Sequence, residues 1–407
     1  MGLQGDEFTE TGLPPEVRYS QATGDTDGRR AGGFRNDGAF KIETAGLEVG
    51  DRAAVESAVI GVKTGDRRFS RLMDKQGRSG LPVPARNVRS EDDRPLVPLP
   101  DLAIFGDSFV EGFGINYSWP AWLRDYFLPE TGDLRGVHPL GDGSQDASQI
   151  AARVGARDVY VTLTGDTMPA SGSVVVTALD PLFITATSEP SIPMTIQGVA
   201  GMITRNGGGV LTFHRETPGV AFAVSPRSVG RADARYWQDC TAIIAAGRNT
   251  TDFDLTIIRQ EVDALNAFQR TVERRSLIIG ITNASQSKPD TTSSGYPDES
   301  AGSTRYSAMR AANDDLAFTY GDRFVDMHRY LVDRGQREAA LLSAAGYFTP
   351  FALNWTIHAA TYAAQDAADI AKDIVPTSLR TDGLHLNTFG AAVYAFAIFR
   401  RLRALGY

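Results

Sequence analysis

Four short apolar runs, separated by helical patterns, constrain the fold of this chain more than any other feature. The runs are nearly continuous, are bounded by turn residues, and cover residues 101–105, 241–247, 276–282 and 323–327. Strands that are buried on both faces have this composition, because neither face of their sheet meets water. Helical patterns follow the first three runs. The alternation predicts an α/β fold, with an open parallel sheet and helices on both of its faces.

Residues 157–230 break this alternation. They form short segments that are rich in β-branched residues, alternate with a period of two, and are separated by Gly, Pro and Asn, with no helical pattern among them. The segments are RDVYVTLTG, GSVVVTAL, PLFITATS, IPMTIQGV, GGVLTFHRE and VAFAVSP. We therefore predict a small all-β domain at 157–230, inserted into an α/β domain made of residues 97–156 and 231–407. Residues 1–96 are predicted to be an N-terminal extension, whose role the sequence does not indicate.

Composition excludes several classes of protein. Of the 407 residues, 42% are hydrophobic and 22% charged, which is typical of a globular chain. The formal charge of −8 argues against a nucleic-acid partner, which a basic surface would normally bind. The chain lacks an apolar run of membrane-spanning length and a recognisable signal peptide. We expect a soluble protein with no membrane partner, and an extracellular or virion-associated location remains open.

The first apolar run ends in Gly106-Asp107-Ser108. This could be an ordinary turn with a helix cap, or it could present Ser108 as a nucleophile. A serine hydroxyl needs a base within hydrogen-bond reach and a third group that orients the base. Among the five histidines, His385 has Asp382 three residues before it, across a glycine turn. One short loop could hold that carboxylate against the imidazole, although the same pattern also fits an Asx-type turn.

Acyl transfer also needs hydrogen-bond donors for the oxyanion that develops on the substrate. In an open parallel sheet such donors belong at the carboxyl ends of the strands. Asn249 follows the run 241–247, and its side-chain amide is one candidate. Gly143 and Ser144 lie in a glycine-rich turn before a helical pattern, where free backbone N–H groups are available.

Together, the four segments resemble the conserved blocks of the GDSL/SGNH hydrolase superfamily, in that family's order. The blocks here are Gly106-Asp107-Ser108, the turn at residues 141–145, Gly247-Arg248-Asn249 and Asp382-x-x-His385. The stretches SQIAARVGA, AGRNT, YGDRFVDM and SLRTDGLHLN also resemble a bacterial and phage branch of that superfamily that carries a β-rich insertion. The resemblance covers about residues 98–407.

The resemblance implies a three-layer αβα, flavodoxin-like fold and a serine esterase. It implies Ser108 as nucleophile, His385 as general base and then acid, and Asp382 as its orienting partner. The implied oxyanion hole consists of the Ser108 N–H, an N–H of Gly143 or Ser144, and the Asn249 amide. Glycine is usual in the family where this chain has Ser144. The family chemistry needs neither a metal nor an organic cofactor.

The substrate is expected to be a small ester or an O-acetylated glycan. An inserted β module beside a shallow cleft would suit a polymer, so we favour the removal of O-acetyl groups from a carbohydrate. A general short-chain carboxylesterase or lipase is the alternative within enzymes. A catalytically silent, glycan-binding virion or surface protein is the alternative from another class.

Overall fold

The computed structural model describes residues 99–115, 117–185, 191–270, 275–286 and 296–407, together with short strands nearer the N-terminus. The chain divides into two units, Met1–Pro98 and Leu99–Tyr407. In the first unit, three antiparallel strands form one sheet and two more form a pair. These strands are β1 (Arg18–Ser20), β2 (Gly32–Phe34), β3 (Phe40–Ile42), β4 (Val59–Ile60) and β5 (Arg71–Leu72). The rest of the predicted extension at 1–96 lies outside the described residues.

The second unit contains a parallel sheet of five strands in the order β18-β17-β16-β6-β7. The strands are β6 (Leu102–Gly106), β7 (Val137–Gly141), β16 (Thr241–Ala245), β17 (Ser276–Ile279) and β18 (Phe324–Val325). All four apolar runs supply a strand, as predicted. The chain first moves from β6 to β7 and then returns to the other side of β6 with β16. A ligand crevice of an open α/β sheet lies at such a reversal, outside the carboxyl ends of the strands.

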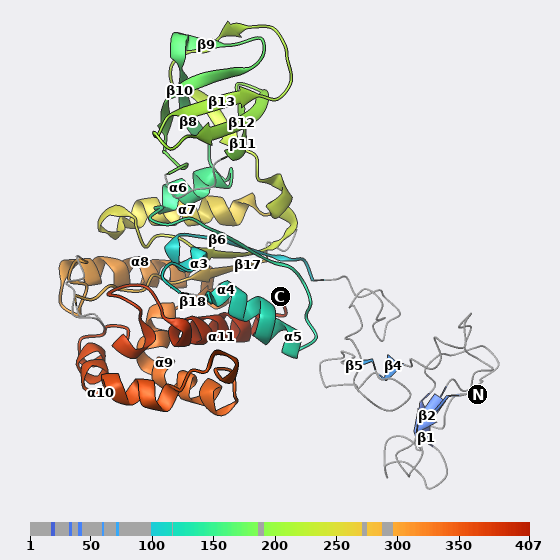
Figure 1. Cartoon of the computed structure of the whole chain (residues 1–407), viewed down its shortest axis with the longest axis vertical. Coiled ribbons are helices and arrows are strands. Elements are labelled where there is room, and N and C mark those ends of the chain that lie inside the picture. Colours follow the sequence, from blue (N-terminus) through green and yellow to red (C-terminus); the bar gives the residue numbers. More distant parts are fainter. Residues whose placement is uncertain are drawn as a thin grey trace. The chain divides into compact units, whose positions relative to one another are not determined.

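Helices cover both faces of this sheet (Figure 1). Ala103 and Phe105 face one helical layer, whereas Leu102 and Ile104 face the other, because successive strand residues point to opposite faces. The first layer contains α6 (Ala147–Arg153), α7 (Leu255–Phe268) and α8 (Thr304–Tyr320). The second contains α4 (Trp119–Trp122), α9 (Met327–Ala344) and α11 (Thr388–Leu405). The sequence prediction of a doubly covered sheet is therefore confirmed.

Further helices and turns complete the unit. Trp119 and Trp122 are buried in the second layer, as expected for core residues. The remaining helices are α3 (Ser108–Glu111), the π-helical turn η3 (Leu123–Phe127), α5 (Leu128–Glu130) and α10 (Trp355–Ala371). The 3-10 turns are η4 (Thr164–Asp166), η5 (Arg235–Asp239), η6 (Thr251–Phe253), η7 (Gly321–Arg323), η8 (Thr349–Phe351) and η9 (Thr377–Leu379). Among the described residues, none of the helices has both the length and the apolar character that crossing a bilayer requires.

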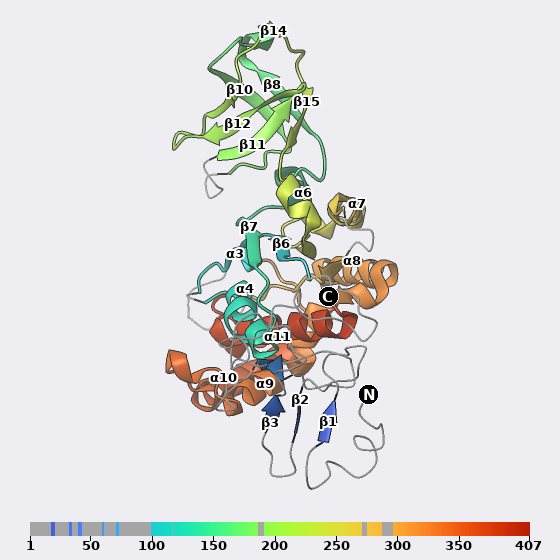
Figure 2. The same ribbon diagram turned by 90° about the vertical axis from the view of Figure 1, so that its right-hand side faces the viewer.

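A closed antiparallel barrel of six strands is inserted between α6 and η5 (Figure 2). Its strands are β8 (Val159–Leu163), β10 (Ser173–Asp180), β11 (Ser191–Ile196), β12 (Val199–Arg205), β13 (Leu211–Arg215) and β15 (Ser228–Ala232), with the pair β9 (Thr167–Met168) and β14 (Phe222–Ala223) beside it. Along β8 the buried residues Val159, Val161 and Leu163 alternate with more exposed ones. This period of two is the pattern that predicted a β-rich insertion.

One predicted strand of the insertion is not found among the residues that the structure describes. Within PLFITATS the structure describes residues 181–185, and none of them is in a strand. Phe183 and Ile184 are neighbours and are both fully buried in the barrel core. Two successive residues of a barrel strand cannot both point inward, so this segment packs as an irregular plug instead. The sixth strand of the barrel is β15, which sequence reasoning did not identify.

Candidate active site

Ser108, His385 and Asp382 lie together although Ser108 and His385 are 277 positions apart in the chain. The Ser108 Oγ is 2.9 Å from His385 Nε2, and His385 Nδ1 is 2.8 Å from Asp382 Oδ2. Ser108 follows the end of β6, and His385 lies in the loop before α11. Both side chains are buried apart from a small exposed fraction. This arrangement joins a hydroxyl, an imidazole and a carboxylate in one chain of hydrogen bonds.

The Asp382 carboxylate fixes the direction of the protons in this chain. Burial would raise its pKa, but hydrogen bonds from the His385 side chain and from the N–H groups of Leu384 and His385 lower the pKa to about 2. An ionised carboxylate only accepts hydrogen bonds, so His385 Nδ1 carries the proton and Nε2 can accept one from Ser108. Because the pKa is lowered, this interaction stabilises the fold above pH 3.8 and is lost as the pH falls towards 2.

The loop that carries Asp382 and His385 is anchored by a buried arginine. The Arg380 guanidinium bonds to Asp369 Oδ2 on α10 at 2.9 Å, to the Val375 carbonyl at 2.8 Å and to the Asp382 carbonyl at 3.2 Å. The loop closes with a bond from the Thr381 N–H to the His385 carbonyl. Each loop end is thus held before a substrate binds.

After the loop, α11 begins at an asparagine cap. The Asn387 side chain accepts from the Gly390 N–H at 3.0 Å and donates to the Ser378 carbonyl at 2.8 Å. A Cβ at Gly390 would lie 2.1 Å from the Leu379 carbonyl oxygen, so only glycine permits this approach of the helix. Asn387 is therefore the N-cap of α11.

Ser108 is the first residue of α3, and Asp107 caps that helix. The Asp107 side chain accepts from the Phe109 N–H at 3.0 Å, and its carbonyl accepts from Val110 and Glu111. The Ser108 N–H has no intrahelical acceptor at this position and can donate elsewhere. Burial raises the pKa of Asp107 to about 6. The short helix also packs closely on β7, because a Cβ at Gly141 would lie 2.3 Å from the Glu111 nitrogen.

The turn after β7 lies at the same sheet edge as Ser108. Gly106 is in register with Gly141, so the turn at 142–145 begins level with the end of β6. Gly143 is buried, whereas Ser144 is exposed. Ser144 has a φ of 64°, in the left-handed region that favours glycine. This explains in physical terms why glycine suits the position.

Gln145 joins the turn to the inserted barrel. Its side chain is fully buried; Nε2 donates to Asp142 Oδ2 at 2.6 Å and to the Phe183 carbonyl at 2.7 Å, and Oε1 accepts from Arg153 Nε at 2.8 Å. The Gln145 backbone carbonyl accepts from Asn249 Nδ2 at 3.1 Å. A primary amide carries two N–H donors, so this bond leaves one on Asn249 for another acceptor. Asn249 is therefore tied to the turn that contains Gly143.

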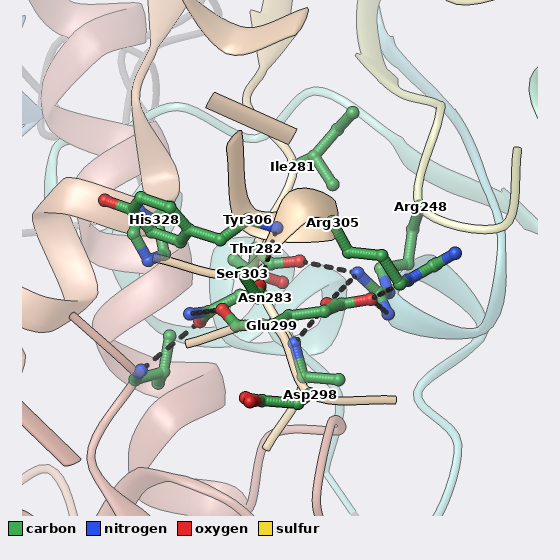
Figure 3. Close-up of polar contacts among 12 residues, drawn as sticks. Arg248, Ile281, Thr282, Asn283, Asp298, Glu299, Ser303, Arg305, Tyr306 and His328 are labelled. Carbon is green, nitrogen blue, oxygen red and sulfur yellow. Dashed lines mark hydrogen bonds and ion pairs between the residues drawn. The ribbon is translucent and has the colours of Figure 1, made fainter. Parts of the chain in front are cut away.

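A buried ion pair holds the residue next to Asn249 (Figure 3). The Arg248 guanidinium bonds to both oxygens of Glu299, at 2.7 and 2.9 Å, and Arg305 adds a third contact at 3.2 Å. Glu299 also accepts from the Ala284 N–H at 2.6 Å. Arg248 and Glu299 are both buried. Breaking one partner of such a pair typically costs about 3–5 kcal/mol, so the loop around Asn249 is firmly fixed.

The other four histidines have structural partners outside this site. His138 bonds to Asp101 at 3.1 Å, and His214 bonds to Thr204 in the barrel at 3.0 Å. His328 and His358 bond to backbone carbonyls, at 2.9 and 2.8 Å. Burial lowers the pKa of His328. None of these four contacts is made to Ser108, His385 or Asp382.

Sequence reasoning missed Gln145, Arg380, Glu299 and Phe113. Arg380, two residues before Asp382, is the only Lys or Arg in the sequence between residues 373 and 399, and that isolated positive charge was an available signal. Phe113 is exposed, and its ring centre lies 4.6 Å from that of His385. No local pattern marks Gln145, Glu299 or Phe113, because their partners come from distant segments.

Comparison with known proteins adds little. No protein-family model matches the chain, and no curated protein matches it. Among solved structures, a peptidoglycan O-acetylesterase matches with 12% identity over 75% of this chain and 91% of its own, at a TM-score of 0.28. A likeness this weak carries no argument about the present chain.

Proposed function

We propose that this protein is a serine esterase of the GDSL/SGNH type. The observation that supports it most is the hydrogen-bonded series from Ser108 through His385 to Asp382, with distances of 2.9 and 2.8 Å. Hydroxyl, imidazole and carboxylate in this order are the groups that nucleophilic acyl transfer requires. The reversal of the sheet order beside β6 also agrees with such an enzyme.

In the proposed reaction, Ser108 Oγ attacks the ester carbonyl while its proton passes to His385 Nε2. The tetrahedral species collapses, the ester C–O bond breaks, and the imidazolium gives the proton to the leaving alcohol. A water molecule, deprotonated by His385, then attacks the acyl carbon. The bond from that carbon to Ser108 Oγ breaks, the imidazolium returns its proton to Oγ, and the acid is released. Asp382 holds the imidazole and stabilises its charged form. A histidine in this role typically contributes about 10²- to 10⁴-fold in rate.

The proposed oxyanion hole consists of the Ser108 N–H, the Gly143 or Ser144 N–H, and the Asn249 amide. It is supported by the register of the sheet, which aligns Gly106 with both Gly141 and Ala245. Each donor follows one of these strand ends within a few residues. Donors fixed in advance are worth more than mobile ones, since they need no reorganisation during reaction.

We propose an O-acetylated carbohydrate as the substrate, with a general short-chain ester as the alternative. The inserted barrel supports the first, because a second module beside the α/β domain extends the surface available to a polymer. No metal or organic cofactor takes part in the proposed reaction. If the site were silent, the same chain would act only as a glycan-binding protein.

Hydrolysis of p-nitrophenyl acetate by the full chain tests this proposal. The unaltered protein should release nitrophenol well above background. Ser108→Ala, shown to be folded by circular dichroism, should not exceed background. Equal rates from both proteins would overturn the proposal and favour a binding role. Acetate release from a panel of acetylated polysaccharides would then distinguish the carbohydrate substrate from a general ester.

A further inference from the structure

A small cavity opens beside the Ser108–His385 pair. Its volume is about 10 Å³, which is close to the space that one water-sized group needs. The lining residues are Ser108, Phe109, Gly112, Phe113, Ile115, Trp119, His385, Leu386 and Ala391. We call this cavity the side pocket. Apart from Ser108, His385 and Trp119, whose buried indole N–H has no hydrogen-bond partner among the described residues, it is lined by apolar side chains and glycine.

The walls of the side pocket differ in how they are held. Phe109, Trp119 and Ala391 are buried members of the core layer that contains α4 and α11. Phe113 is 55% exposed, and it lies between Gly112 and Gly114, both at positive φ. Phe113 is therefore the lining residue whose side chain can be replaced without exposing the hydrophobic core.

The position of the side pocket favours the acyl half of an ester as its occupant. In the proposed reaction the acyl carbon becomes bonded to Ser108 Oγ and stays there until water attacks. The alcohol half must leave towards solvent. A largely apolar space that Ser108 itself lines is thus within one or two bonds of the acyl carbon, and it favours an apolar group over a charged one.

We propose, on the basis of the proposed esterase function, that the side pocket receives the methyl group of an acetyl ester and that Phe113 sets this limit. The volume leaves room for only one small group beside Ser108. Each further methylene must displace the Phe113 ring from its place 4.6 Å from the His385 ring. Phe113 is a specificity-determining residue in this account, and the acetyl group is the preferred acyl group.

The experiment compares kcat/KM for p-nitrophenyl acetate, butyrate and hexanoate. The unaltered protein should prefer acetate. In Phe113→Ala the ratio of butyrate to acetate should rise by up to about tenfold, because the ring no longer occupies the space that the two additional methylenes need. Phe113→Leu should give an intermediate ratio. Phe318→Ala is the matched control, since Phe318 is 91% exposed on α8 and should leave the ratio unchanged.

The outcomes separate this inference from the function on which it rests. Activity on esters with the same ratio in Phe113→Ala and in the unaltered protein would overturn the acyl limit alone. A preference of the unaltered protein for hexanoate would also overturn it. Inactivity of the unaltered protein towards all three esters would overturn the esterase function, and the acyl limit with it.

Discussion

The two sides of Ser108 are built differently. On the base side, the Asp382–His385 loop is held by Arg380 from within and by the Asn387 cap behind it, and each polar contact is made between protein groups. On the oxyanion side, Asn249 already donates one N–H to the turn that contains Gly143, and Ser144 adopts a conformation that is costly for its residue type. The base side holds the His385 imidazole in one orientation. On the oxyanion side, Asn249 uses one N–H to hold the turn and keeps a second N–H that can donate to the substrate.

This difference predicts how substitutions will act. A change on the base side should reduce the rate by misdirecting the imidazole, while the fold keeps its other anchors. A change on the oxyanion side should alter both the rate and the packing of the turn, because Gln145 links that turn to the barrel. Four substitutions test this difference between the two sides, and they are given in order of decreasing expected effect.

Asp382→Asn should have the largest effect, a fall in kcat of about 10⁴-fold. The amide can donate to His385 Nδ1 and so stabilise the tautomer that cannot accept the Ser108 proton. Hydrolysis of p-nitrophenyl acetate measures the loss, and thermal unfolding checks that the loop persists. A loss of less than about tenfold would show that Asp382 does not orient the imidazole.

Asn249→Ala should lower kcat by about 10²- to 10³-fold, as expected for the loss of one oxyanion donor. KM should change much less, since the donor acts mainly in the transition state. Asn206→Ala in a barrel turn is the matched control and should leave kcat unchanged. If KM rises while kcat is kept, Asn249 instead contributes to ground-state binding.

Asp107→Asn tests the buried carboxyl between the two sides. Burial raises the pKa of Asp107 from 3.8 to about 6, so the folded state holds this proton more tightly than the unfolded state. Stability should therefore fall as the pH rises from 4 to 6 in the unaltered protein, by up to about 3 kcal/mol. The variant keeps the cap acceptor and should lack this fall. Chemical denaturation at pH 4 and pH 8 measures it, and parallel pH profiles for both proteins would refute the assignment.

Ser144→Gly should have the smallest effect, a gain of about 0.5 kcal/mol in the free energy of unfolding. Relief of the left-handed backbone is worth about 1–2 kcal/mol, and the greater freedom of glycine in the unfolded chain offsets part of it. Ser148→Gly, in the regular helix α6, should instead destabilise the protein. Destabilisation by both substitutions would mean that the turn is not strained.

Much of the fold could be predicted because its signals are local. The strands of the parallel sheet are continuous apolar runs, whereas the barrel strands alternate between apolar and polar residues. The sequence therefore distinguishes the α/β domain from the inserted barrel. One exception is β15, which sequence reasoning did not identify. Another is the segment with Phe183 and Ile184, whose aromatic and β-branched side chains fill the barrel core although these residues are not in a strand. The β-propensity of a segment does not show whether it forms a barrel strand or fills the barrel core.

The candidate site could be predicted only in part. Ser108, Asn249 and the Asp382–His385 loop each follow a local pattern, and the edge rule for parallel sheets suggests that they meet. The contacts that hold them come from elsewhere: Glu299 reaches Arg248 from a distant loop, and Gln145 meets the barrel through Phe183. Such pairs leave no periodic signal, so no single segment reveals them. The roles and domain boundaries assigned from sequence remain predictions.

Covalent labelling tests the central claim most directly. A fluorophosphonate reacts with a serine whose hydroxyl is activated by a neighbouring base, and peptide mapping by mass spectrometry locates the adduct. We predict one adduct, on Ser108, and labelling at least about 10³-fold slower in His385→Ala. Labelling at another residue, or equal rates at Ser108 in both proteins, would contradict the account.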